Sequence, residues 1–71
     1  MEVFRIIPTE PYTGGAAYVA ANDVEEAIKT FREEDYRDWE YKYGNCTCNH
    51  VVNMSYNIDK PFVIFDDLWL D

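Results

Sequence analysis

The chain has 71 residues and a formal net charge of −8 at pH 7, and 48% of its residues are hydrophobic and 17% aromatic. This hydrophobic content is too high for a disordered chain, so we expect a single folded domain over residues 1–71. Because Lys and Arg make the contacts to nucleic-acid phosphates and anionic headgroups, 14 acidic residues against 6 basic ones argue against nucleic acid and membrane surfaces as direct partners.

The first third of the chain predicts two strands. β-Branched and aromatic residues dominate "EVFRIIP" (2–8), and Pro8 ends the run because it cannot donate to a ladder. A turn-rich link containing Gly14 and Gly15 follows, and "AAYVAA" (16–21) then predicts a second strand. We expect the two strands to pair antiparallel as a hairpin.

A helix is predicted directly after the second strand, because the spacing of apolar residues changes from two to about 3.6. Asn22 is the expected N-cap, and Glu25 is expected to reach back to it as in a capping box. Four apolar residues fall on the side that should face the sheet: Val24, Ala27, Ile28 and Phe31.

The second half of the chain shows alternation typical of strands. In "DWEYKY" (38–43), which is either a strand or an extension of the helix, every second residue is aromatic. "FVIF" (62–65) predicts a short strand that is apolar on both sides. If Phe62 and Ile64 face the helix, Val63 and Phe65 face away from it, and we take Val63 and Phe65 as candidates for the open face. Between them, one longer strand is expected to place seven residues on one apolar face: Cys46, Cys48, His50, Val52, Met54, Tyr56 and Ile58.

The segment "GNCTCNH" (44–50) holds both thiols and the only imidazole of the chain. If Gly44 and Asn45 form a hairpin turn, the thiols face the aromatic residues of 38–43, and burial there makes them unreactive small hydrophobes. The competing hypothesis is a metal site. Zinc requires four ligands, or three and an open position, and only Asp59 or a C-terminal aspartate is available as the fourth. We therefore expect no metal and no cofactor.

No other pattern predicts catalysis. "TGG" (13–15) lacks the spacing of a phosphate-binding loop, and the adjacent Asp66 and Asp67 should point to opposite faces of a strand. A Cys–His nucleophile would lack an orienting third group. From these missing catalytic patterns we expect that the protein is not an enzyme. The N-terminal residues do not resemble an export signal, and no apolar run is long enough for a membrane span. We therefore expect a cytoplasmic protein with free thiols.

The segment "GGAAYVAANDVEEA" (14–27) resembles small uncharacterised bacterial proteins of strand-strand-helix-strand-strand order. In these proteins a Gly-Gly turn leads into a strand that ends in Val-Ala-Ala, and the next helix opens with Glu-Glu-Ala. The resemblance implies a compact α+β fold and a bacterial or phage setting. It implies no activity and no catalytic residue.

Together these observations predict an α+β fold, a small antiparallel sheet of four or five strands with one helix packed on one face. One helix covers one face only, so the apolar second face predicts an interface. We hypothesise a non-enzymatic protein-interaction or adaptor module that forms a homodimer. The alternative is an acidic inhibitor that imitates nucleic acid and blocks a DNA-binding enzyme, which requires carboxylates along one continuous surface. The candidate interface residues are Trp39, Tyr41, Tyr43, Val63, Phe65 and Trp69.

Overall fold

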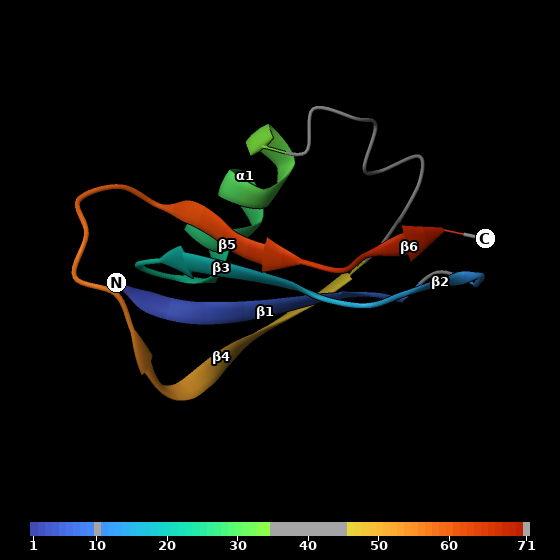
Figure 1. Cartoon of the computed structure of the whole chain (residues 1–71), viewed down its shortest axis with the longest axis horizontal. Coiled ribbons are helices and arrows are strands. Elements are labelled where there is room, and N and C mark those ends of the chain that lie inside the picture. Colours follow the sequence, from blue (N-terminus) through green and yellow to red (C-terminus); the bar gives the residue numbers. More distant parts are fainter. Residues whose placement is uncertain (10, 35–45, 71) are drawn as a thin grey trace.

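The computed structural model describes residues 1–9, 11–34 and 46–70. It confirms the α+β fold, with one helix packed on a small antiparallel sheet (Figure 1). The elements are β1 (Glu2–Pro8), β2 (Thr13–Gly14), β3 (Ala17–Ala21), α1 (Val24–Glu34), β4 (Cys46–Ser55), β5 (Phe62–Asp66) and β6 (Trp69–Leu70).

Four strands form the main sheet in the order β4-β1-β3-β5, and β2 and β6 pair as a separate two-stranded sheet. The predicted antiparallel pairing of the first two long strands is confirmed, with Arg5 of β1 opposite Tyr18 of β3. Strand β4 pairs with the other side of β1, and β5 pairs with the other side of β3. These two central strands, β1 and β3, contain most of the buried hydrophobic residues.

The N-cap of helix α1 lies one residue later in the chain than predicted. The carboxylate of Asp23 accepts a hydrogen bond from the Glu26 amide at 2.8 Å, which makes Asp23 the N-cap. The side chain of Glu26 in turn accepts the backbone N–H of Asn22 at 2.8 Å. The prediction that Asn22 caps the helix and Glu25 reaches back was therefore wrong by one position, because Asp23 offers the better-placed acceptor.

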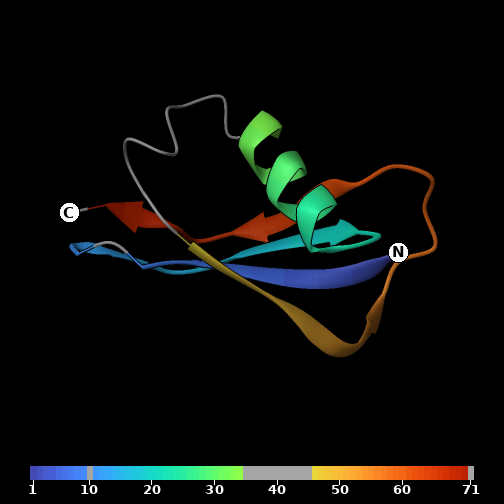
Figure 2. The ribbon, with the colours of Figure 1, turned by 180° about the vertical axis from the view of Figure 1, so that it is seen from behind.

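The helix lies behind the sheet in Figure 1 and in front of it in Figure 2, so it covers one face only. Val24, predicted to face the sheet, is 41% exposed because it lies in the first turn, at the rim of the contact. The part of the chain that the structure describes contains no helix that is long and apolar enough to cross a membrane. The buried cluster under the helix consists of Phe4, Ile6, Ala17, Val19, Ala21, Ala27 and Phe31, with Ile28, Cys46, Cys48, Val63 and Leu68 packed against it.

Strand β4 does not continue the apolar face that its alternation predicts. Val51 pairs with Val3, but the next pair is Ser55 with Glu2, so the three residues between them have no partner on β1. Val52 in this bulge is 70% exposed. The prediction of one apolar layer from Cys46 to Ile58 was therefore wrong beyond the middle of the strand, because a bulge resets which side chains face the sheet.

A second irregularity decides the orientation of β5. Val63 pairs with Val19, and Phe65 pairs with Tyr18, so Ile64 is an extra residue on β5. Directly paired residues lie on the same face of a sheet, and Val63 therefore packs against the core under the helix. Its predicted position on the open face was wrong.

The link between β1 and β3 is held by the C-terminal segment rather than by turn chemistry alone. Gly14, expected in a turn, pairs with Trp69 of β6, and a side chain at Gly14 would collide with the indole. Gly15 has φ +83°, and Asp67 lies against it. Asp67 also accepts the Ala16 amide through its carboxylate at 2.8 Å and donates its own amide to the Ala16 carbonyl at 3.1 Å.

Candidate functional site

The face of the sheet opposite α1, called here the far face, is only partly covered by the chain itself. At one end, the register places Val51, Val3, Ala20 and Phe62 side by side across all four strands. Val3 and Ala20 are 0% exposed although they lie outside the cluster under the helix. Tyr56 packs edge to face against Phe62, with ring centroids 5.6 Å apart. This end of the far face is a small second core.

The next set of side chains across the sheet, called here the Arg5 row, is open. It consists of Asn49 on β4, Arg5 on β1, Tyr18 on β3 and Phe65 on β5, which are direct register partners. Arg5 and Asn49 are exposed, and Phe65 is 55% exposed. The rings of Tyr18 and Phe65 lie 6.3 Å apart at 36°. The row thus has a polar half with hydrogen-bond donors and an aromatic half.

Charge is distributed unevenly between the two faces. By the register of the described strands, Arg5 is the only charged side chain on the far face. Glu2 lies on the helix side instead, where its Oε2 is 3.8 Å from Nε2 of His50. In a chain of net charge −8, the residues that the described strands place on the far face therefore include one positive group and no carboxylate.

The chemistry of the Arg5 row suits binding rather than catalysis. A guanidinium presents a fixed fork of N–H donors, and an Asn amide adds further donors beside it. The aromatic half offers apolar contact area at low cost in side-chain entropy. Among its members there is no pairing of a nucleophile with a base.

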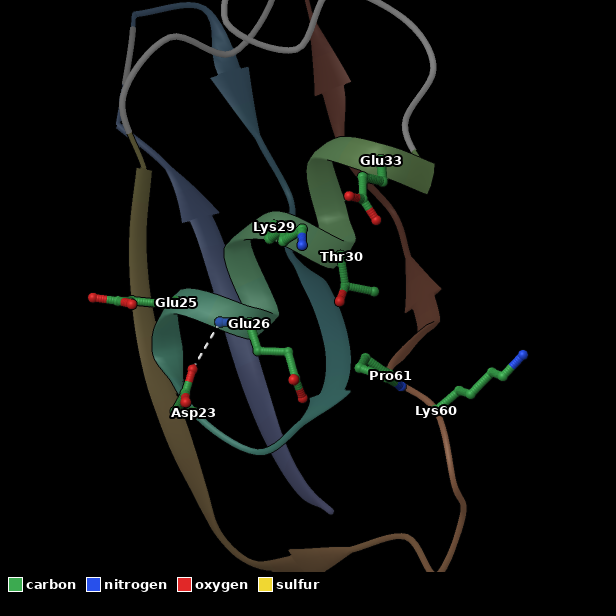
Figure 3. A pocket seen from close by; sticks show the side chains of 8 residues that line it. All are labelled: Asp23, Glu25, Glu26, Lys29, Thr30, Glu33, Lys60 and Pro61. Atoms are coloured by element: carbon green, nitrogen blue, oxygen red, sulfur yellow. Dashed lines mark hydrogen bonds between the residues drawn. The ribbon is translucent and has the colours of Figure 1, made fainter.

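A shallow groove of about 560 Å³ lies on the helix side, between α1 and the segment before β5 (Figure 3). Two of its carboxylates, Asp23 and Glu26, are already used in capping the helix. Lys29 and Lys60 are interspersed with the acids, so the groove is a mixed charged surface of the kind that solvated helices present.

The thiols that stand out in the sequence lie on the helix side and are half-buried and free. Burial raises the pKa of the Cys48 thiol to about 11, and the neighbouring Cys46 contributes a smaller part of this rise. Burial also raises the pKa of Cys46, and the nearby charge of Arg32 partly offsets this rise. His50 packs against Phe4 with the two rings tilted by 51° and their centroids 5.6 Å apart. In the described part of the chain, no three His, Cys, Asp or Glu residues gather as metal ligands.

The predicted interface residues have different fates. Phe65 lies on the open far face, and Trp69 is 53% exposed over Gly14. Val63 belongs to the core instead. Three predicted members lie outside the described residues: Trp39, Tyr41 and Tyr43.

Three members of the Arg5 row were missed from the sequence: Arg5, Tyr18 and Asn49. The signal for Arg5 was present, because it is the only basic residue in the otherwise apolar run 3–8. No sequence signal aligned it with Tyr18 and Asn49, since that depends on the register of three strands.

Comparisons with known proteins add no relative: no protein-family model, curated protein or solved structure matches the chain. The resemblance of residues 14–27 to small bacterial proteins stays a prediction.

Proposed function

We propose that the chain is a non-enzymatic protein-interaction module that binds its partner with the far face. The observation that carries this proposal is the open Arg5 row, in which Phe65 is 55% exposed beside Tyr18. Aromatic residues and Arg are the residue types most enriched in protein interfaces.

The edges of the sheet are less suited to a partner than its face. Strand β4 is interrupted by the bulge at Val52, and β5 is interrupted at Ile64. Bulges at sheet edges twist the strand and hinder pairing with a further strand. Addition of a partner strand is therefore disfavoured at both edges.

The proposed setting is the cytoplasm, as expected from the sequence. Both cysteines are free, and burial raises the pKa of each thiol, so neither is poised to form a disulfide.

Capture of partners by a tagged copy in the native host tests the proposal. We expect Phe65→Ser to remove a captured protein, because it deletes the aromatic half of the far face. The matched control is Val52→Ser, since Val52 is also exposed but lies in the bulge of β4. Equal loss in both variants, or in neither, contradicts binding through the far face.

The same experiment addresses the alternative hypothesis of a nucleic-acid mimic. Glu25→Gln with Glu33→Gln neutralises two acids of the groove beside α1 and leaves the far face unchanged. Loss of a DNA-binding enzyme from the captured set after this change, with Phe65→Ser harmless, would favour the mimic.

A further inference from the structure

The chain is strongly acidic, yet the strand residues of its far face include no acid and one exposed guanidinium, that of Arg5. Structural needs do not explain Arg5. Among the residues of the described strands, no carboxylate shares its face, and its neighbours across the strands are Asn49 and Tyr18. An exposed strand position of this kind would serve the fold equally well with Thr or Val, which have high strand propensity.

We infer that the Arg5 row binds a segment of another protein that presents one carboxylate side chain next to an aromatic or large aliphatic side chain. The inference rests on the proposed function and names the partner chemistry of that same surface. The carboxylate pairs with Arg5 and Asn49, and the apolar side chain lies over Tyr18 and Phe65.

The choice of a carboxylate follows from the donors. Guanidinium and carboxylate groups match in a bidentate geometry, and an Asn amide beside them can donate to the same group. Because no strand residue described on the far face is an acid, an incoming carboxylate meets no like charge across the Arg5 row. A segment with several negative charges is less suitable, since the chain as a whole carries −8.

The distance between adjacent strands sets the separation of the two side chains in the partner segment. Adjacent strands lie about 4.8 Å apart, so a point between Tyr18 and Phe65 is roughly 7 Å from Arg5 across the strands. Residues i and i+2 of an extended segment are also about 7 Å apart and point to the same side. An aromatic residue two positions from an Asp or Glu therefore spans the row.

A second copy of this chain fits the row less well. A twofold axis through the middle of the far face would bring two Arg5 guanidinium groups together, and neither copy has a described carboxylate on that face to separate them. Like charges in direct apposition cost several kcal/mol at an interface. The partner that Arg5 selects is thus a different chain.

The test uses two blocked peptides, acetyl-Trp-Gly-Asp-amide and acetyl-Trp-Gly-Asn-amide, titrated into the isotope-labelled full chain and followed by NMR. We expect the Asp peptide to shift the side-chain N–H signals of Arg5 and Asn49 and the ring signals of Phe65. An exposed ion pair contributes up to about 1 kcal/mol, so the Asn peptide should bind about fivefold more weakly.

Variants with equal charge separate a local contact from a general charge effect. Arg5→Gln should bind both peptides equally, whereas Lys29→Gln, which removes the same charge from α1, should keep the preference for the Asp peptide. Phe65→Ala should weaken both peptides alike, and it gives a second readout if Arg5→Gln fails to fold.

Three results would overturn the inference. Equal binding of both peptides to the unmodified chain would show aromatic docking without carboxylate recognition, and the proposed function would stand. Shifts confined to Lys29 and Lys60 would place the carboxylate in the groove. No shift on the far face up to 10 mM peptide would remove the partner chemistry, while host capture with Phe65→Ser would still decide the proposed function separately.

Discussion

Cys48 has an unusually unreactive environment for a thiol on an edge strand. Its side chain packs against the core under α1, and burial together with the adjacent Cys46 raises its pKa to about 11. Since the thiolate is the reactive form, native Cys48 should be alkylated by iodoacetamide at pH 8 far more slowly than the denatured chain. Cys46 should react faster than Cys48, because Arg32 opposes the rise in its pKa.

Site-resolved mass spectrometry after brief alkylation checks this order. Labelling of both thiols at the denatured rate at pH 8 would contradict the packed position of β4.

The same raised pKa predicts a pH dependence of stability. The folded state favours the protonated thiol, so the contribution of Cys48 is complete below its ordinary pKa of 9.0 and is lost as pH rises through about 11. Denaturant unfolding from pH 8 to 11 should show a steeper loss for the unmodified chain than for Cys48→Ala. Parallel curves would mean that Cys48 has the same pKa in the folded and unfolded chain.

Gly15 is the position where a single methyl group should cost most. Its φ of +83° is unfavourable for any residue with a Cβ, and the added atom would collide with the backbone of Asp67. We expect Gly15→Ala to lower the free energy of unfolding by about 2 kcal/mol. Gly14→Ala is the control, because the atoms nearest to its added methyl group belong to the half-exposed side chain of Trp69 rather than to the backbone. An equal loss in both variants would contradict this account.

Sequence periodicity predicted the elements that depend on local residue types, and it missed the features that depend on the register between strands. The β1–β3 hairpin, α1 and β5 follow from residue types within each segment, and all were predicted at nearly the observed positions. The bulges at Val52 and Ile64 were not predictable from alternation, because an extra residue is visible only against the partner strand. The orientation of Val63, and with it the composition of the candidate site, changed for this reason.

The helix cap allows a direct test. Asp23→Ala removes the acceptor of the Glu26 amide and should destabilise the chain by about 1 kcal/mol. Asn22→Ala keeps the backbone N–H that Glu26 binds, so its effect should stay within about 0.5 kcal/mol. Thermal unfolding of the two variants checks the assignment, and a larger loss for Asn22→Ala would restore the cap that the sequence suggested.

The homodimer predicted from the sequence depends on how much of the second sheet face a single chain leaves uncovered. The buried Val3 and Ala20 show that part of this face is closed within one chain. What is left open contains Arg5, and two copies each carry a net charge of −8. Self-association through the far face is therefore opposed by charge at short and at long range, and the homodimer stays a prediction.

Replacing the Arg5 guanidinium should strengthen any self-association through the far face. Arg5→Leu removes the facing charges and adds apolar area in both copies, so at about 25 cal/mol per Å² it should tighten self-association more than tenfold. Lys29→Leu makes the same change in charge and side chain on α1 and should leave self-association nearly unchanged. Light scattering across a concentration series measures both, and raising the salt should strengthen any dimer by screening the overall repulsion. An unmodified chain that dimerises as tightly as Arg5→Leu would show that the dimer uses a different surface.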